Sequence, residues 1–202
     1  FSKKEVVIIK NFIDEEKLSS YFKKEIDTTK PKAYVFLGGL TKRKNPFSLI
    51  KAFEKLLTKE DVKLHIIGDG PLKKSIKNYI SRQNLENNIF LHGFLNNPYE
   101  ILSKSDLFIL PSFSEGTSRA ALEALFLGVP IILRDVECNY ELIVGENQNG
   151  YLFKEEQNLH LIMNKLSDWS RERYLRQNLL PKIFQKESVI KKYKILFNNL
   201  KI

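Results

Sequence analysis

The fold is decided by residues 110–135, which read Leu-Pro-Ser-Phe-Ser-Glu-Gly-Thr-Ser-Arg-Ala-Ala-Leu-Glu-Ala-Leu-Phe-Leu-Gly-Val-Pro-Ile-Ile-Leu-Arg-Asp. An apolar run reaches Leu110 and stops at Pro111, which is typical of a strand buried on both faces of a parallel sheet. Good helix formers occupy residues 117–127, and Gly128 ends the helix before a second apolar run begins. The pattern predicts a strand, a loop, a helix and a second strand, which together make one βαβ unit.

The loop of this unit carries the candidate chemistry. Glu115 and Gly116 precede the helix, whose first turn exposes backbone N–H groups that have no partner inside the helix. Gly116 lets a phosphate approach the backbone, and Thr117 and Ser118 add hydroxyl donors at the positive end of the helix dipole. We therefore expect the loop to bind an anion.

Two carboxylates flank this expected anion site. Glu123 follows Glu115 by eight positions, about two helical turns, so both point toward the same edge of the sheet if the helix begins near Thr117. A carboxylate is poorly placed beside an anion, but it accepts hydrogen bonds from two sugar hydroxyls well. The alternative is that Glu115 caps the helix and Glu123 is an ordinary solvent-facing helix residue. The local pattern leaves both interpretations open.

The order of these residues resembles a known signature. Pro111-Ser-x-x-Glu115-Gly116, followed by Leu122-Glu123-Ala124-Leu125-x-x-Gly128-Val129-Pro130, closely resembles the E-x7-E signature of family 4 retaining glycosyltransferases, the glycosyl transferases group 1. Those enzymes have the GT-B architecture, in which the carboxy-terminal one of two Rossmann-like domains holds the sugar nucleotide. The resemblance implies that Glu115 is catalytic and faces the donor sugar, and that Glu123 binds the ribose hydroxyls.

A second candidate site follows the apolar run 33–37, which predicts the first strand of the sheet. Gly38-Gly39 ends this strand, and the basic loop 41–45 leads into a helix with Asn45 as its N-cap and Pro46 at its first position. Glycines followed by lysines at a strand end are typical of a phosphate site, and equally of a turn exposed to solvent.

The resemblance favours the phosphate site. The family carries G-R-L-x-x-x-K in this loop, and its Arg and Lys bind the donor diphosphate. Gly38 and Lys44 match that pattern, which implies that Gly38 binds substrate and that Lys44 takes part in catalysis by stabilising the departing diphosphate. Gly39 stands where the family has arginine. This departure implies weaker diphosphate binding, compensation by a cation such as Arg43, or a divergent or inactive member.

Two further strands are expected over residues 62–67 and 89–94. The turn Gly68-Asp69-Gly70-Pro71 resembles the family's G-x-G-P turn and lacks the third glycine of the dinucleotide fingerprint, which disfavours a nicotinamide or flavin enzyme. In relatives the end of the third strand lies near the base. The resemblance therefore implies that a nucleobase packs on the backbone of Gly93, and the alternative is a turn that only ends the strand.

The remaining segments complete an α/β chain. We expect a helix that Asp14 caps after the β-branched run 6–9, short helices over residues 98–105 and 139–144, and an edge strand at 151–153. From Glu155 the pattern is helical, including Leu175 and Leu179. In GT-B relatives the last helix, here residues 186–202, crosses back onto the amino-terminal domain. Strands that alternate with helices predict a Rossmann-like parallel sheet with helices on both faces.

Composition narrows the class of protein. The 202 residues suit one domain, residues 1–202, and 43% of them are hydrophobic. No apolar run approaches the roughly 20 residues that span a bilayer, so a cytoplasmic protein is expected. Cys138 is the single cysteine and has no internal disulfide partner, and no Cys/His cluster has metal-ligand spacing, so no metal is expected. His65, His92 and His160 are expected to be structural or surface residues.

The net charge of +9 arises from lysine clusters spread along the chain. Such a surface suits a phosphorylated substrate and peripheral contact with the inner face of an anionic membrane, and no basic-aromatic array typical of nucleic-acid binding is present. The chain begins with Phe1 rather than Met, so a fragment of a longer protein or a processed product is expected. The missing part is expected to be the amino-terminal acceptor domain.

The resemblance implies the donor-binding domain of a retaining glycosyltransferase that moves a sugar from a nucleotide diphosphate sugar to an acceptor hydroxyl, in cell-surface glycan or polysaccharide synthesis. No cofactor is expected beyond this substrate, and the isolated domain should bind donor without turnover. Two alternatives stay open. One is a non-catalytic nucleotide- or sugar-binding module, which Gly39 motivates, and the other is a nucleotide-sugar epimerase of GT-B shape. The sequence does not set the base, the sugar, the acceptor or the oligomeric state.

Overall fold

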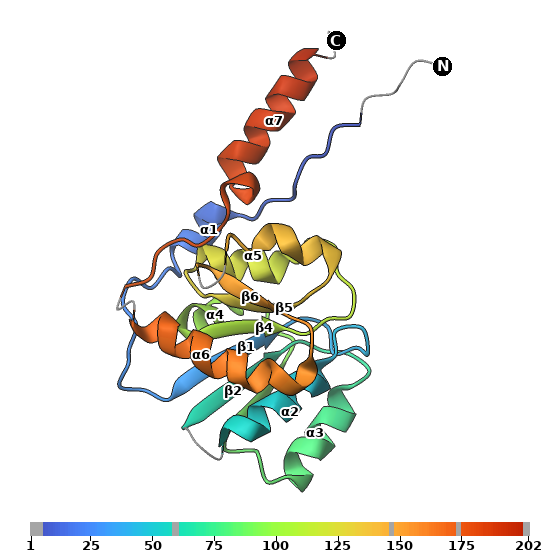
Figure 1. Cartoon of the computed structure of the whole chain (residues 1–202), viewed down its shortest axis with the longest axis vertical. Coiled ribbons are helices and arrows are strands. Elements are labelled where there is room, and N and C mark those ends of the chain that lie inside the picture. The colour runs from blue at the N-terminus through green and yellow to red at the C-terminus, as the bar shows by residue number, and fades with distance from the viewer. Residues whose placement is uncertain (1–5, 58–60, 146–147, 173–174, 200–202) are drawn as a thin grey trace.

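A computed structural model describes residues 6–57, 61–145, 148–172 and 175–199 of the chain. Six parallel strands form one sheet in the order β3-β2-β1-β4-β5-β6 (Figure 1). The strands are β1 (Lys32–Leu37), β2 (Val62–Ile67), β3 (Ile89–Gly93), β4 (Leu107–Leu110), β5 (Ile131–Arg134) and β6 (Gly150–Phe153). The predicted Rossmann-like parallel sheet is therefore confirmed, with β6 as the expected edge strand.

Helices cover both faces of this sheet. They are α1 (Glu15–Ser19), α2 (Pro46–Leu57), α3 (Lys73–Arg82), α4 (Tyr99–Lys104), α5 (Arg119–Phe126), α6 (Leu159–Glu172) and α7 (Lys186–Asn199), with the 3-10 turns η1 (Glu137–Leu142), η2 (Glu156–Asn158) and η3 (Lys182–Phe184). Right-handed crossovers place α2 and α3 on one face, where α2 packs against α6, and place α4 and α5 on the other (Figure 1). Within the described residues, no helix is both long and apolar enough to cross a bilayer.

The unit β4-α5-β5 has the predicted order but a later helix start. All four residues of β4 are buried, as expected for a central strand. Helix α5 begins at Arg119 rather than near Thr117, because Ser118 is extended and its hydroxyl oxygen accepts from the N–H of Ala121 at 3.3 Å. At the other end Gly128 has φ +75°, and its N–H and that of Val129 donate to the last turn of α5, as in a Schellman motif.

Several local predictions were wrong for reasons of tertiary contact. Residues 175–181 are not helical: Leu175 forms an isolated antiparallel bridge with Glu25, and Arg176 donates to the carbonyl oxygens of Ser103 and Ser105, both at 2.7 Å. These contacts hold the segment extended across the sheet. The predicted helix over residues 139–144 is instead the 3-10 turn η1.

Near the amino end, the Asp14 cap of α1 is confirmed, since its carboxylate accepts from the N–H of Lys17 at 3.1 Å. Asn45 precedes α2 with φ +50°, but its amide donates to Glu156 at 2.9 Å instead of serving the helix. The β-branched run 6–9 is not part of a strand.

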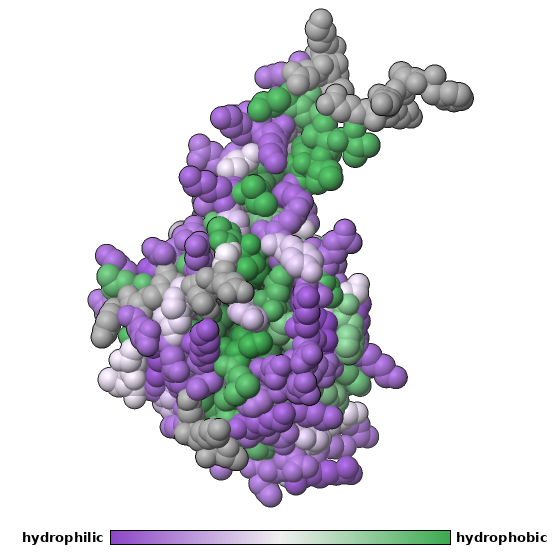
Figure 2. Space-filling model, in the orientation of Figure 1, coloured by the Kyte–Doolittle hydropathy of each residue, from purple (hydrophilic) through white to green (hydrophobic). Residues whose placement is uncertain are grey.

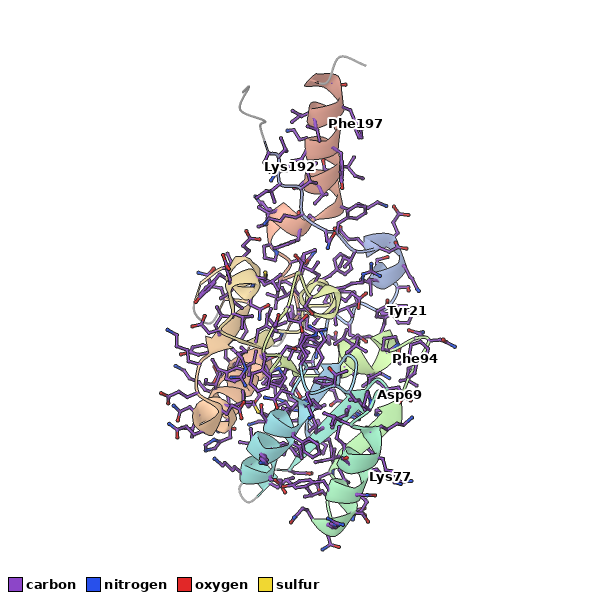
Figure 3. The ribbon with its side chains drawn as sticks, turned by 90° about the vertical axis from the view of Figure 1, so that its right-hand side faces the viewer. Tyr21, Asp69, Lys77, Phe94, Lys192 and Phe197 are labelled. Carbon is purple, nitrogen blue, oxygen red and sulfur yellow. The ribbon has the colours of Figure 1, made fainter. Side chains whose placement is uncertain are left out.

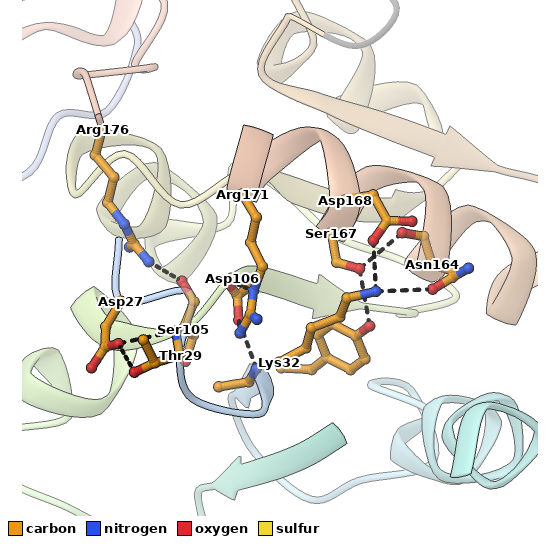
Figure 4. Close-up of polar contacts among 12 residues, drawn as sticks. Asp27, Thr29, Lys32, Ser105, Asp106, Asn164, Ser167, Asp168, Arg171 and Arg176 are labelled. Atoms are coloured by element: carbon orange, nitrogen blue, oxygen red, sulfur yellow. Dashed lines mark hydrogen bonds and ion pairs between the residues drawn. The ribbon is translucent and has the colours of Figure 1, made fainter. Parts of the chain in front are cut away.

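A polar network fastens α6 to the amino ends of the central strands (Figure 4). The guanidinium of Arg171 donates two hydrogen bonds of 3.0 Å to Asp106, the residue before β4. Asp106 also accepts from the N–H of Ala33 in β1 at 2.7 Å, and Lys32 pairs with Asp168 of α6 at 2.6 Å. This network lies at the amino edge of the sheet and leaves the carboxyl edge to the loops.

Helix α7 projects from the rest of the molecule (Figure 1). Val189 near its start is buried, whereas Tyr193, Ile195 and Phe197 are exposed farther along it. Residues 6–8, which leave the body at the same end, are exposed too. Figure 2 shows apolar surface over this projecting part.

Candidate functional site

The sheet changes direction between β1 and β4, which are neighbours although they are far apart in sequence. At such a switch point the loops after the two strands run to opposite faces and open a crevice, which is where ligands bind in open α/β sheets. Residues 38–45 follow β1 and residues 111–118 follow β4. Backbone contact joins the two loops, since the N–H of Phe113 donates to the carbonyl oxygen of Arg43 at 2.9 Å.

The two predicted catalytic side chains meet at this switch point. The ammonium Nζ of Lys44 lies 2.6 Å from Oε1 of Glu115, and the two side chains are only 15% and 6% exposed. Arg43 adds a second cation, 3.4 Å from the same carboxylate oxygen, and donates to the carbonyl oxygen of Ser114 at 2.6 Å. Two cations therefore face one carboxylate, which leaves a net positive charge available for an anion. Glu115 does not cap the helix, because Ser118 does.

Backbone hydrogen bonds tie the ends of β1, β2 and β3 into one glycine-rich edge. The N–H of Gly68 donates to the carbonyl oxygen of Gly93 at 2.7 Å, and that of Gly38 donates to Ile67 at 3.0 Å. Gly68 has φ +141°, and a Cβ there would lie 1.9 Å from the carbonyl oxygen of Gly38. Only glycine fits at that position, so the G-x-G-P turn packs directly against the loop that carries Lys44.

The predicted substrate-binding glycines differ in the space around them. Gly38 lies beside the Lys44–Glu115 pair, because a Cβ on it would be 3.8 Å from Cε of Lys44. Gly93 is buried with φ +72°. Gly116 is exposed, and among the described residues no atom comes within 4 Å of a Cβ built there. Gly39 is exposed and lacks a positive φ, and a Cβ on it would meet the backbone of Asp69 only at 3.8 Å.

Glu123 is buried rather than solvent-facing, which excludes that alternative. Its residue exposure is 8%, and its Oε1 accepts from the hydroxyl of Tyr99 in α4 at 3.3 Å. Burial raises the pKa of Glu123, while Tyr99, Arg119 and Lys17 act in the opposite direction. Glu123 and Glu115 therefore have different partners. Thr117, half-buried, and Ser118, buried, lie in the loop between them in sequence.

Tyr99 is the contact that sequence reasoning missed. It lies in the predicted short helix over residues 98–105, and its place there gives no sign of a partner 24 residues away. No local signal in the sequence could have paired the two side chains. By contrast Arg43, which the sequence suggested as a compensating cation, does lie beside Glu115.

Two cavities lie away from the Lys44–Glu115 pair. One of about 860 Å³ lies between α3 and the edge strand β3, and its lining includes Lys74, Lys77 and Phe90. Another of about 400 Å³ lies at the amino edge around Asp106 and Arg171.

In the part of the chain that is described, no three His, Cys, Asp or Glu side chains are grouped to hold a metal ion. The residues at the switch point instead offer cations, backbone N–H groups and carboxylates, which suit a phosphorylated sugar compound.

Comparison with known proteins agrees with this geometry. Residues 15–185 match the family described as glycosyl transferases group 1. The chain is 34% identical over 151 residues to the N-acetylgalactosamine-N,N'-diacetylbacillosaminyl-diphospho-undecaprenol 4-alpha-N-acetylgalactosaminyltransferase of Campylobacter jejuni, covering 75% of this chain and 40% of that protein. It is 27% identical over 208 residues to the poly(ribitol-phosphate) alpha-N-acetylglucosaminyltransferase of Staphylococcus aureus, covering 98% and 41%.

Solved structures show the same fold. A variant of S. aureus TarM in complex with fondaparinux, alpha-GlcNAc-glycerol and UDP superposes with a TM-score of 0.77 at 25% identity, over 98% of this chain and 40% of that one. Anabaena HepE in complex with UDP gives a TM-score of 0.75 at 18% identity, over 96% and 57%. The chain thus spans 40% of the length of the Campylobacter relative and 41% of that of the Staphylococcus relative. It belongs to the glycosyl transferases group 1 family, and its fold is one half of the GT-B architecture.

Proposed function

We propose that this chain is the donor-binding, carboxy-terminal domain of a retaining glycosyltransferase. The complete enzyme would transfer a sugar from a nucleotide diphosphate sugar to an acceptor hydroxyl, in the synthesis of a cell-surface glycan. The observation that carries this proposal is the Lys44–Glu115 pair of 2.6 Å at the switch point of the sheet, beside the glycine loops that end β1 to β3.

Each residue has a role that its position supports. The charges of Lys44 and Arg43 would stabilise the negative charge that develops on the departing diphosphate, and a partly buried cation does this better than one in bulk water. Backbone N–H groups near Gly38 and Gly116 would approach the phosphates. Glu115 would face the donor sugar once the diphosphate competes for its cations. Glu123 would accept from the ribose hydroxyls, and Gly93 would support the base.

The relatives support a nucleotide sugar as donor, since TarM and HepE have been solved with UDP. Because the chain spans only part of its relatives, we place the acceptor site in another domain of the complete protein. The exposed apolar residues of α7 and of residues 6–8 would pack against that domain, as the predicted crossover of residues 186–202 requires. Residues 200–202 lie outside the described part of the chain.

Isothermal titration with a panel of UDP, GDP, ADP and the matching nucleosides tests the donor proposal. We expect the domain to bind one diphosphate well and its nucleoside much more weakly, with unchanged affinity after treatment with EDTA. Failure to bind any member of the panel would contradict a working donor site. Binding that EDTA abolishes would contradict the proposed independence from metal.

Gly39 keeps a non-catalytic binding module as the second candidate, because the family arginine is absent. A product assay with the complete protein separates the candidates better than any binding measurement. Transfer of sugar to an acceptor supports the transferase, and binding without product supports the module. Interconversion of free nucleotide sugars would instead indicate an epimerase.

We also propose that the domain works in the cytoplasm with peripheral contact to the inner face of the membrane. Its net charge of +9 and the diphospho-undecaprenol acceptor in the name of the Campylobacter relative support this placement. Co-sedimentation with vesicles checks it: salt-sensitive binding to vesicles with anionic lipid, and none to phosphatidylcholine alone, is expected. Equal binding to both or to neither would contradict it.

A further inference from the structure

The carboxylate of Glu123 lies in a cluster that three separate elements build. Tyr99 of α4 donates its hydroxyl to Oε1 of Glu123 at 3.3 Å. Lys17 of α1 and Arg119 of α5 are the cations whose charges act on the same carboxylate, and Asp14 before α1 acts on Tyr99. A buried carboxylate needs such partners, because removal from water disfavours its ionised form.

The segment around α1 in turn holds Tyr99. The rings of Tyr21 and Tyr99 are tilted by 52° with their centroids 5.5 Å apart, and Nζ of Lys17 lies 5.4 Å from the centroid of Tyr99. Asn97 joins the two tyrosines, since its amide donates to the hydroxyl of Tyr21 at 2.8 Å and its Oδ1 accepts from the N–H of Tyr99 at 3.2 Å. Figure 3 shows Tyr21 on the side of the molecule that also carries Phe94, the residue after β3.

We propose that Tyr99 is a positioning residue for Glu123, and that the segment around α1 keeps Tyr99 in place through Lys17 and Tyr21. The hydrogen bond to Oε1 fixes the orientation of the carboxylate and favours its ionised form, while Oε2 remains as an acceptor for a diol. The identity of that diol, a ribose, rests on the proposed function. Lys17 and Tyr21, which precede the sheet, would thus contribute to donor binding although they belong to neither the loop after β1 nor the loop after β4.

The proposal predicts a shifted titration. Burial already raises the pKa of Glu123, and the Tyr99 hydroxyl opposes that rise. Burial and the Glu123 charge also raise the pKa of Tyr99, so its hydroxyl keeps its proton and donates at neutral pH. Tyr99→Phe removes only this donor. The pKa of Glu123 should therefore rise further, and its carboxylate should be lost at a higher pH than in the unmodified domain.

Tyr79→Phe is a matched control, because Tyr79 donates to Glu54 at 2.9 Å in the same kind of pair, away from the switch point. NMR titration of the side-chain carboxyl carbons in the ligand-free domain measures the pKa of Glu123 directly. We expect an upward shift in Tyr99→Phe, a smaller one in Lys17→Met and none in Tyr79→Phe. An unchanged Glu123 titration in Tyr99→Phe and Lys17→Met would overturn the proposal.

Titration with UDP and with uridine at pH 8 and pH 6 measures the consequence for binding. We expect Tyr99→Phe to weaken both ligands by on the order of three- to tenfold at pH 8 and by more at pH 6, with no change for Tyr79→Phe. Unchanged or tighter binding would show that Tyr99 is irrelevant or only occupies the diol's place, and would overturn the proposal. If the unmodified domain binds no nucleotide, the proposed function fails, and the NMR titration still decides whether Tyr99 positions Glu123.

Discussion

Lys44 faces Glu115, so a diphosphate that binds at the switch point must share this ammonium with a carboxylate. That arrangement holds the cation in place before the ligand arrives. Removal of Lys44 would therefore have two effects. The bound diphosphate would lose a cation, and the largely buried carboxylate of Glu115 would lose its nearest one.

We expect Lys44→Ala to weaken binding of a nucleoside diphosphate by about 1.5–3 kcal/mol and binding of the nucleoside far less, since the lost contact is a charge-assisted hydrogen bond. Added salt should narrow the difference, because the contact is partly exposed. Lys165→Ala, at an exposed position on α6, is the control and should change neither affinity. Equal losses for both ligands would place Lys44 outside the diphosphate site.

Glu123→Gln keeps the shape of the side chain and removes its charge. We expect it to weaken binding of a nucleotide sugar by about 1.5–3 kcal/mol, because a neutral amide accepts hydroxyl donors less strongly than a carboxylate does. Glu54→Gln is the control: it alters the similar Tyr79–Glu54 hydrogen bond between α3 and α2, and it should leave the affinity unchanged. Calorimetry measures both variants, and an unaltered affinity for Glu123→Gln would remove ribose binding from its role.

Gly39→Arg introduces the cation that the family pattern has at this position. Because Gly39 has no positive φ and a Cβ there meets only ordinary contacts at 3.8 Å, we expect the variant to fold with nearly unchanged stability. Its guanidinium should tighten binding of a nucleoside diphosphate, since a planar fork matches two phosphate oxygens. Affinity is measured beside thermal unfolding. A stable variant without tighter binding would indicate that Arg43 already serves the phosphates.

Strands β2 and β3 place a histidine pair at the edge of the sheet. Nδ1 of His65 lies 2.9 Å from Nε2 of His92, and burial together with the His92 charge lowers the pKa of His65 to about 4. In the unfolded chain the same group titrates near 6.5. Between these two values the unfolded chain binds a proton that the folded chain does not, so folding stability falls as the pH is lowered through this window.

His65→Gln removes this titration. We therefore expect the free energy of unfolding of the variant to fall less than that of the unmodified domain between pH 6.5 and pH 4.5, where carboxylate titrations affect both proteins alike. Urea unfolding at several pH values supplies the measurement. Parallel curves for the two proteins would show that His65 does not titrate with the lowered pKa.

The bounds of the strands and helices show which parts of the fold could be predicted from the sequence. Apolar runs found the six strands of the described residues. The central strand β4 is buried along its whole length, which leaves little choice of residues there. Gly128 marked the end of α5 correctly, since a helix that stops with a left-handed residue favours glycine. The start of α5 and the extended segment 175–181 were missed. The start of α5 is set by the local cap that Ser118 makes with Ala121, whereas the extended segment depends on partners far along the chain, such as the carbonyl oxygens that Arg176 contacts.

In the candidate site, too, some features could be predicted from the sequence and others depend on the fold. Glu115, Lys44 and the glycines that end strands were predicted as site residues from motifs that resemble those of the family. The Lys44–Glu115 contact joins residues 71 apart, and only the pairing of β1 with β4 brings them together. Tyr99 carried no motif at all. Local pattern thus predicts which residues have the chemistry, whereas sheet order decides which of them meet.

Across the whole molecule, the candidate site residues gather at the carboxyl edge of the sheet, around the switch point between β1 and β4. The amino edge is fastened by the Asp106–Arg171 network, and the carboxyl edge carries loops tied together by backbone hydrogen bonds. Exposed apolar residues on α7 lie on a part that projects from this body (Figures 1 and 2). On the proposed function, the carboxyl edge would bind the donor and the exposed surface of α7 would pack against a second domain.

The central claim is that a nucleotide sugar binds at this edge, between the loops after β1 and β4. Backbone amide NMR of the domain during addition of UDP tests it most directly, with uridine as the control without phosphate. We expect shifts at residues 38–45, 93–94 and 115–118, with those at 38–45 and 115–118 absent for uridine. Shifts confined to the cavity beside α3 or to the one at the amino edge, while residues 38–45 and 115–118 stay unchanged, would contradict it.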